Sequence, residues 1–527
     1  MITYATIKST YPVSCALLTD MPGIENLLSE ASALPEVLRD DPQIRRKYPY
    51  LADLARIEWA RHTLLNQPAS PLARITELTV NPALELLPVS WNQLVECFDD
   101  SKIIPQQGDG FVLVWKKAGA GIKMKSATNQ DLLALKIVSE EISTQEAAES
   151  GKVSIGAIDD VLYRAISRGL LLAPPSLIAR SPEFPRGIIS VEKYLVSPVF
   201  TLQWHVTQVC DLHCRHCYDR SDRSPLQLDD AVRILDDLYE FCQQHHVYGQ
   251  VSFTGGNPLL YPHFNEVYHQ AAERGFLTAI LGNPMSAHRI DELLAIQKPG
   301  FYQVSLEGLQ EHNDYIRGKG HFERVFEFLE LLRNREIYSM VMLTLTRANM
   351  DQVLDLAELL RGRTDLFTFN RLSLVGEGAD LISAPIENYP AFLRSYLKAA
   401  ENNPVIARKD SLLNIILEED GKPVFGGCAG YGCGAAFNFV SLLPDGEVHA
   451  CRKFPSPMGN IFKQNLAQIY HSESARRYRA GSQACNDCSI RPVCGGCMAV
   501  SYGMGKDIFT ERDPYCFKGG QIMKELS

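Results

Sequence analysis

The sequence lacks the features that mark several classes of protein. It has no stretch of about 18 apolar residues, and its first residues lack the basic and apolar segments of a signal peptide, so neither a membrane-spanning helix nor secretion is expected. It has no low-complexity tract and no fixed-period repeat, and 46% of its residues are hydrophobic, which excludes a fibre and a largely disordered chain. Basic residues are in the minority, and the net charge of −10 favours neither nucleic acid nor a membrane as a partner.

Cysteine, by contrast, is abundant and unevenly distributed. Of the 14 cysteines in 527 residues, Cys15, Cys97 and Cys242 stand alone and the other eleven form two groups. A chain of this length can bury a large core without disulfides, so clustered cysteines favour metal binding by a reduced, cytoplasmic protein. The first group is Cys210, Cys214 and Cys217, and the second is Cys428, Cys433, Cys451, Cys485, Cys488, Cys494, Cys497 and Cys516.

Composition and periodicity divide the chain into five predicted segments. Apolar residues recur at helical spacing within 51–65, whereas prolines interrupt the stretch that follows residue 173. The predicted segments are a helical N-terminal region (1–80), a small mixed unit (83–175), a linker (176–195), an α/β domain (196–400) and a loop-rich, cysteine-rich domain (401–527).

Residues 83–175 have the outline of a winged helix-turn-helix. Two β-rich runs, 111–118 and 122–127, flank a predicted turn at Gly119–Gly121 and precede three helical segments. We expect Asn129 to cap the first of these helices, and Gly151 and Gly169 to end the second and third. DNA binding by this unit is disfavoured, because its nine Lys and Arg are outnumbered by twelve Asp and Glu.

Six short apolar runs alternate with helical segments between residues 196 and 400. This alternation predicts a parallel sheet with right-handed crossovers, and six repeats fit an open, partial (β/α)6 barrel. The fold class is therefore α/β. The predicted strands are 200–207, 249–256, 277–283, 301–308, 339–346 and 367–376.

The first cysteine group directly follows the first predicted barrel strand, in the sequence VTQVCDLHCRHCYDR. Its spacing, Cys210-x3-Cys214-x2-Cys217, brings three thiolates together on one loop, and thiolates are the usual ligands of iron–sulfur clusters. A four-iron cluster held by three cysteines leaves one iron free to bind another molecule. Because His213 and His216 lie between the cysteines, a zinc site is the alternative.

This spacing at this position resembles the radical S-adenosylmethionine (radical SAM) superfamily. Gly255-Gly256-Asn257-Pro258 stands where that family has Gly-Gly-Glu-Pro, which receives the methionine amino group of SAM, and the change to Asn removes a charge from that contact. Ser305 matches a residue that faces the SAM ribose, and Arg317 one that can pair with the SAM carboxylate. The resemblance implies a SAM-binding [4Fe–4S] cluster and a 5′-deoxyadenosyl radical that abstracts hydrogen from the substrate.

The second cysteine group resembles the SPASM extension of radical SAM enzymes that modify peptides and proteins. The resemblance implies two auxiliary [4Fe–4S] clusters, with two zinc sites or disulfides as alternatives. In the sulfatase-maturing branch an Asp base follows the third of these cysteines, whereas Arg452 stands here, so that base and that substrate are not carried over. The implied ligand sets are Cys428, Cys433, Cys451 and Cys497 for one cluster and Cys485, Cys488, Cys494 and Cys516 for the other.

A small acidic winged unit ahead of such an enzyme resembles the peptide-recognition element of ribosomal-peptide biosynthesis, with a packing or dimerisation domain as the alternative. In that family a leader peptide adds as an extra strand, here beside Ile122–Ser126 and against Ile158–Arg168. The whole layout resembles radical SAM/SPASM peptide maturases, including those of selenobiotic-type peptides. It implies an oxidoreductase that converts a ribosomally made, cysteine-containing precursor peptide into a crosslinked, heterocyclic or thioether-type product, with a flavodoxin or ferredoxin as reductant.

Two other functions stay open at this point. One is a radical SAM enzyme that acts on a protein side chain or on a small molecule such as a tetrapyrrole precursor. The other is a non-enzymatic iron–sulfur protein for electron transfer or regulation, which the SAM-site motifs disfavour. No catalytic acid or base can be assigned, since Glu307, Asp219 and Arg452 are identified only as neighbours of the site.

Overall fold

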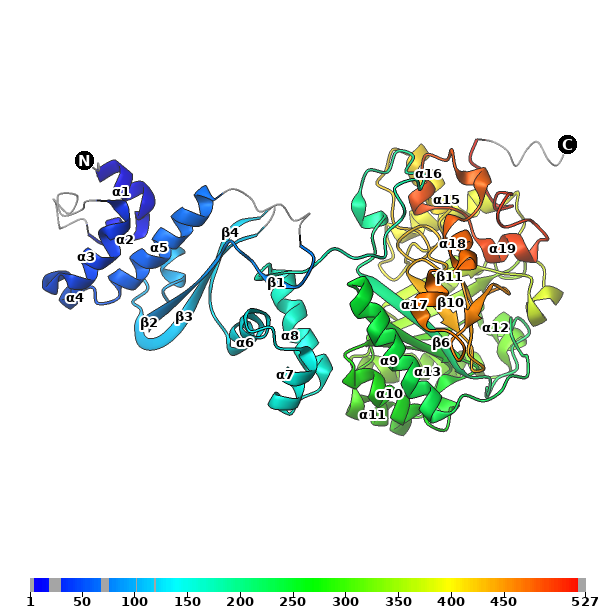
Figure 1. Cartoon of the computed structure of the whole chain (residues 1–527). Helices are drawn as coiled ribbons and strands as arrows, with labels where there is room; N and C mark the ends of the chain where they lie inside the picture. The colour runs from blue at the N-terminus through cyan, green and yellow to red at the C-terminus, as the bar shows by residue number, and fades with distance from the viewer. Residues whose placement is uncertain (1–3, 19–29, 68–74, 101, 118–119, 520–527) are drawn as a thin grey trace. The chain divides into compact units, whose positions relative to one another are not determined.

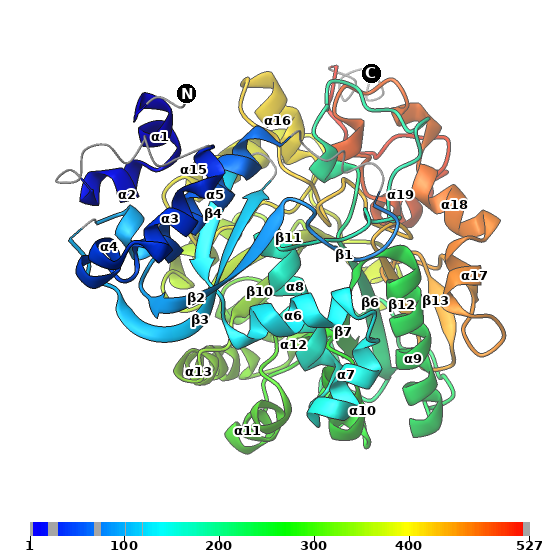
Figure 2. The same cartoon turned by 60° about the vertical axis from the view of Figure 1, so that its left-hand side comes forward.

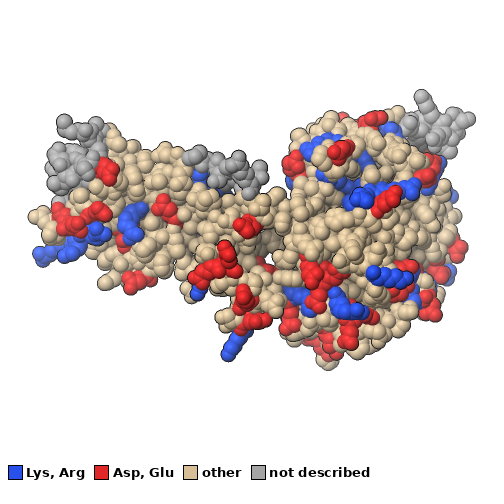
Figure 3. Space-filling view, viewed as in Figure 1, with Lys and Arg blue, Asp and Glu red and all other residues tan. Residues whose placement is uncertain are grey.

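The computed structural model describes residues 4–18, 30–67, 75–100, 102–117 and 120–519 (Figure 1). The chain divides into two compact units, Met1–Pro175 and Ser176–Ser527. Within the described residues, no helix is both long and apolar enough to cross a membrane. On the face seen in Figure 3, Lys and Arg side chains lie among Asp and Glu side chains and do not form one continuous basic surface.

The first unit begins with short helices that surround a longer one, α5. Residues 19–29 and 68–74 of the predicted helical region lie outside the described residues. The buried carboxylate of Glu58 on α5 accepts hydrogen bonds from the backbone N–H groups of Val13 (2.6 Å) and Ser14 (3.1 Å), which fixes the start of α2 against α5. The helices are α1 (Tyr4–Thr10), α2 (Pro12–Leu17), α3 (Leu34–Asp40), α4 (Pro42–Lys47) and α5 (Leu51–Asn66).

A three-stranded antiparallel sheet follows, in the order β2-β3-β4 (Leu84–Asn92, Gln106–Lys117, Gly121–Ser126). The sequence predicted β3 and β4 but missed β2, which contains Pro88 and has few fully buried residues. Residues 118–119 of the predicted turn lie outside the described residues. Four consecutive residues of β3, Val112–Trp115, are buried, because helices cover both faces of the sheet. The first helices and residues 83–175 therefore share a core and one compact unit.

The other face of this sheet carries α6 (Asn129–Ser139), α7 (Thr144–Gly151) and α8 (Ile155–Arg168), followed by β5 (Leu171–Leu172), which pairs with β1 (Thr79–Val80). The prediction that Asn129 caps α6 was wrong. Thr128 is the cap, since its hydroxyl accepts from the backbone N–H of Asp131 while the Asp131 carboxylate accepts from the backbone N–H of Thr128, which is a capping box. Gly169 ends α8 in the left-handed conformation as predicted, but α7 ends with Lys152 in that conformation rather than Gly151.

The second unit contains all six predicted strands as neighbouring parallel strands of one sheet, and this confirms the α/β partial barrel. Helices pack on the outside of these strands (Figure 2). The strands are β6 (Val199–Thr207), β7 (Tyr248–Gly255), β8 (Leu277–Leu281), β9 (Phe301–Ser305), β10 (Ser339–Leu345) and β11 (Leu366–Arg371). The helices are α9 (Leu228–His245), α10 (Phe264–Glu273), α11 (Ala287–Ile296), α12 (Gln310–Arg317), α13 (His321–Asn334) and α14 (Val353–Leu359).

The cysteine-rich part continues the barrel sheet instead of forming a separate one. Strand β12 (Phe439–Leu442) pairs in parallel with β6, and β13 (Glu447–His449) and β14 (Pro457–Asn460) add antiparallel hairpins, so the sheet has the order β11-β10-β9-β8-β7-β6-β12-β13-β14. The C-terminal helices are α15 (Tyr389–Ala400), α16 (Leu413–Glu419), α17 (Leu466–Tyr470), α18 (Glu473–Ala480) and α19 (Met498–Gly503).

Candidate functional site

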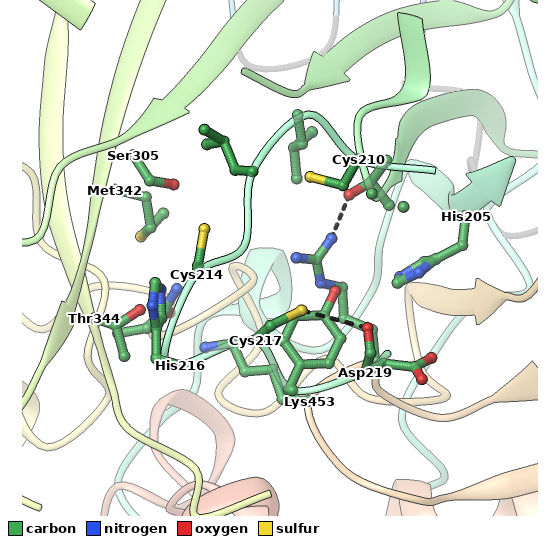
Figure 4. Close-up of a pocket in the computed structure, with 18 of the residues that line it drawn as sticks. His205, Cys210, Cys214, His216, Cys217, Asp219, Ser305, Met342, Thr344 and Lys453 are labelled. Atoms are coloured by element: carbon green, nitrogen blue, oxygen red, sulfur yellow. Dashed lines mark hydrogen bonds between the residues drawn. The ribbon is translucent and has the colours of Figure 1, made fainter. Parts of the chain in front are cut away.

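A cavity of about 320 Å³ lies where the parallel strands of the second unit end, and it is referred to below as the first cavity. Cys210, Cys214 and Cys217 all line it, on the loop between β6 and α9. Figure 4 shows their three sulfur atoms around one space, with Ser305 of β9 on another side of it. The carboxyl ends of parallel strands are where barrel enzymes place their reacting groups, so this cavity is the candidate site.

Two glycines at the end of β7 hold the cysteine loop in place. A Cβ on Gly255, whose φ is +131°, would lie 2.1 Å from the carbonyl oxygen of Thr207. A Cβ on Gly256 would lie 2.2 Å from the carbonyl oxygen of Val209. Gly256 N–H donates to Thr207, and Asn257 N–H donates to Val209. The Gly-Gly pair is therefore required for the close approach of two backbones, whatever further contact it makes with a ligand.

Asn257 is completely buried next to a carboxylate. Its Nδ2 donates to Asp211 Oδ1 at 3.0 Å, and Asn283 Nδ2 donates to the same oxygen at 2.6 Å. The side-chain oxygen of Asn257 has no hydrogen-bond partner among the described residues, which leaves one buried acceptor free for a donor. Asp211 thus places a negative charge beside the position where Asn replaces the usual Glu. Pro258 begins the short 3-10 turn that follows.

Arg317 lies at the end of α12, lines the first cavity and is held by a buried carboxylate. Its Nε and Nη2 donate to Glu307 Oε1 at 2.9 and 2.6 Å, and its Nη1 lies 3.8 Å from Cys214 Sγ. Burial alone would raise the pKa of Glu307, but His216 and Arg317 outweigh it and hold that pKa far below its usual range. This pairing could not be predicted from the sequence, because Glu307 lies in the loop after β9 and Arg317 at the far end of α12, and the geometry of that loop decides whether the two meet.

The eight C-terminal cysteines lie in two sets of four. Cys428, Cys433, Cys451 and Cys497 line a second cavity of about 660 Å³, which also faces the interior of the barrel strands. Cys485, Cys488, Cys494 and Cys516 line a third cavity of about 240 Å³. Within the described residues, no three His, Cys, Asp or Glu side chains are close enough to hold one metal ion. Each iron of a four-iron cluster binds one thiolate, so each set of four cysteines supplies the donors that one such cluster needs.

The first and second cavities are contiguous, since Leu281, Gln303, Met342, Asn370, Arg371, Arg452 and Lys453 line both. Arg452 donates to the Thr254 hydroxyl, and its guanidinium carbon lies 4.8 Å from the centre of the Tyr218 ring. The buried side chain of His205 also lines the first cavity (Figure 4), and both of its ring nitrogens lack partners among the described residues. Burial and the charge of Arg452 lower the pKa of His205 well below its usual value.

Comparison with known proteins matches this chain to two family descriptions. Residues 204–360 match the radical SAM superfamily, and residues 433–497 match SPASM, an iron–sulfur cluster-binding domain. Mycofactocin maturase MftC of Mycolicibacterium smegmatis is 30% identical over 355 residues, covering 64% of this chain and 86% of that protein. The chain belongs to the radical SAM superfamily. It is therefore an enzyme, which excludes the non-enzymatic alternative.

Other radical SAM relatives are more distant. The subtilosin biosynthesis protein AlbA of Bacillus subtilis is 25% identical over 317 residues, covering 56% of this chain and 66% of AlbA. The AdoMet-dependent heme synthase of Methanosarcina barkeri is 24% identical over 347 residues, covering 60% and 95%. Among solved structures, SuiB of Streptococcus suis bound to SAM aligns with a TM-score of 0.50 at 16% identity, covering 77% of this chain and 96% of SuiB, which shows a shared fold.

Membership in this family settles the cofactors in general terms. The radical SAM domain uses SAM and a [4Fe–4S] cluster, and the SPASM domain carries auxiliary iron–sulfur clusters. The cysteines fit these groups. Three line the first cavity, with the free Asn257 oxygen beside it, and four line each of the second and third cavities. The assignment of individual cysteines and SAM contacts stays a prediction.

Proposed function

We propose that this radical SAM enzyme oxidatively modifies a ribosomally synthesised, cysteine-containing peptide. The supporting observation is that the first cavity, with its three cysteines, is contiguous with the second, with four. A substrate residue held where they meet would be next to both the SAM site and an auxiliary cluster. The two relatives named for peptide products, MftC and AlbA, support a peptide as the substrate class. The product is a crosslink, a heterocycle or a thioether.

In this proposal the residues divide as follows. Cys210, Cys214 and Cys217 hold the SAM cluster. Ser305, Arg317 and the Gly255–Pro258 turn contact SAM, with the Asn257 oxygen accepting from its amino group. When bound, the reduced cluster would supply the one electron that cleaves SAM into methionine and a 5′-deoxyadenosyl radical, and that radical would take a hydrogen atom from the substrate. The two sets of four C-terminal cysteines would hold two auxiliary clusters that can accept the electron given up by the substrate radical. A flavodoxin or ferredoxin supplies electrons, and such oxygen-sensitive clusters call for a reducing cytoplasm.

The first unit is proposed to bind the leader part of the precursor peptide. Strand β4 pairs with β3 alone, so Ile122–Ser126 forms an edge of the sheet in the described structure. An edge strand offers unpaired backbone N–H and C=O groups to which an extended peptide can add as a further strand. The unit has a net charge of −3 over residues 83–175, so the leader that it binds is expected to be basic rather than acidic.

A small-molecule substrate such as a tetrapyrrole precursor is the second candidate, because AdoMet-dependent heme synthases are among the relatives. The two candidate substrates, peptide and tetrapyrrole, are distinguished by incubating each with the anaerobically reconstituted enzyme, SAM and a reductant. Peptides encoded by short reading frames beside the gene are expected to raise 5′-deoxyadenosine formation and to lose hydrogen by mass spectrometry, whereas C214A with the same peptide should do neither. Stimulation by a tetrapyrrole and by no peptide would establish the second candidate.

A further inference from the structure

The second cavity contains cationic side chains that lack an acidic partner. Lys409, Arg452 and Lys453 line it, and none of the three forms an ion pair with a carboxylate among the described residues. The hydrogen-bond partner of Lys409 Nζ among the described residues is the sulfur of Met342, at 3.8 Å. Arg452 uses one nitrogen on the Thr254 hydroxyl and stacks on Tyr218, which fixes the guanidinium and leaves its other N–H groups available.

The carboxylates near these cations already have other hydrogen-bond or ion-pair partners. Asp410, the acidic residue that lines the second cavity, accepts from Arg371 Nε at 2.7 Å and from the backbone of Leu412 at 2.9 Å. Asp219, in the first cavity, accepts from Gln208 and Ser221 and lies 3.7 Å from Arg223. Three cationic side chains therefore face one cavity without a carboxylate partner among the described residues, an arrangement that a bound carboxylate would stabilise.

Arg452 stands where the sulfatase-maturing branch has an Asp base. A guanidinium does not release its proton in proteins, so this position serves binding rather than proton transfer.

We propose that Lys409, Arg452 and Lys453 form a binding site for a carboxylate of the substrate. The carboxylate is an Asp or Glu side chain or the free C-terminus of the peptide. Held there, it would position the neighbouring substrate residue at the junction of the first and second cavities, because Arg452 and Lys453 line both. The inference rests on the proposed peptide substrate and adds a chemical requirement to it: an acidic group close to the residue that is modified.

The cations have a competing explanation, which is that they only balance the negative charge of a cluster held by Cys428, Cys433, Cys451 and Cys497. Burial raises the pKa of the Cys451 and Cys497 thiols, and the positive charge of the nearby Lys453 offsets part of that rise. In that case the three side chains would tune the reduction potential of the auxiliary cluster and would show no preference for a carboxylate over a neutral group of the same shape.

The test uses the full-length, cluster-loaded protein with SAM and needs no turnover. Its probes are short acetylated peptides in matched pairs, Asp against Asn, Glu against Gln, and free against amidated C-terminus. We expect acidic members to bind at least about tenfold more tightly than their amides, which corresponds to about 1.4 kcal/mol. The pair that shows the difference identifies the source of the carboxylate. In a second readout, acidic peptides should protect Lys409 and Lys453 from acylation, as measured by mass spectrometry.

Three variants and one control complete the test. K409M, R452Q and K453Q are each expected to remove most of the acid–amide difference, whereas K463Q, at an exposed lysine outside these cavities, should retain it. Equal binding of acid and amide by the unmodified enzyme would overturn the inference. So would variants that shift the potential of the auxiliary cluster but keep the preference. Failure of the proposed function appears separately, as an absence of peptide modification whatever the binding preference.

Discussion

Replacing Glu307 by Gln removes the negative charge from the buried hydrogen-bond network beside Cys214. The substitution tests how much that charge contributes to the free energy of unfolding. The side chain is 2% exposed and accepts from Arg317 twice, at 2.9 and 2.6 Å, and from the backbone N–H of Thr344 at 2.8 Å. The change to Gln keeps the shape but leaves the Arg317 charge buried without a partner. Removing one member of a buried pair costs about 3–5 kcal/mol, so we expect E307Q to lower the free energy of unfolding by about that amount.

The assay is anaerobic urea unfolding of the full chain, followed by circular dichroism. As a control, E377Q removes a carboxylate that is 44% exposed and 3.8 Å from Arg220, and it should cost less than about 1 kcal/mol. The double variant E307Q/R317M has no unpaired Arg317 charge left in the interior. Its loss of free energy of unfolding should therefore be about 2–3 kcal/mol smaller than the sum of the losses in the two single variants. Additive effects, or an E307Q effect as small as that of the control, would refute the reasoning.

E307Q also tests how the stability of the protein changes with pH. The pKa of Glu307 is lower in the folded protein than the ordinary value of 4.5, so the unfolded chain binds its proton first as the pH falls. The stability that this carboxylate contributes is present above about pH 4.5 and is lost progressively below it. E307Q should therefore flatten the acid side of the stability profile, and an acid side as steep as that of the unmodified protein would contradict this assignment.

Three further predictions concern the metal sites and the core. Anaerobic reconstitution should load about twelve irons per chain, as expected for three four-iron clusters, and stoichiometric zinc would contradict this. G256A places a Cβ 2.2 Å from the Val209 carbonyl, so it should displace the cysteine loop and lower the iron content by about four while sparing the auxiliary clusters. R371M leaves Asp410 and Asp513, both buried, without their common partner (2.7 Å to each), and calorimetry should show destabilisation of about 3–5 kcal/mol.

The barrel could be predicted from the sequence because short, mostly apolar runs alternate with helical segments. The run 339–346 is an example, and parallel strands covered by helices have this pattern. Strand β2 has no such run, since its residues alternate between partial burial and exposure and include Pro88. The cap of α6 was misplaced by one residue, because Thr128 and Asn129 both suit that position and the reciprocal bond with Asp131 decides between them.

The site could be predicted only where the motif is local. Cys210, Cys214 and Cys217 lie within eight residues, so their spacing alone brings them together. The charged groups around them are brought together by tertiary packing. Arg371 pairs with Asp513, which is 142 residues away in the chain. Lys409 lines the same cavity as Arg452 and Lys453, although they belong to different segments. His205 looked like an ordinary strand residue, and only its burial without hydrogen-bond partners distinguishes it.

The pairing of β12 with β6 has a consequence for how the protein is made. Its partners are 238 residues apart in the chain, so β6 leaves the ribosome long before the strand that covers its edge. Until then the strand that carries the cysteine loop has one open edge, which can pair with other chains. Contacts between such distant residues also form slowly. We therefore expect the nascent enzyme to depend on chaperones, and chains truncated before residue 439 to aggregate rather than to yield a usable barrel.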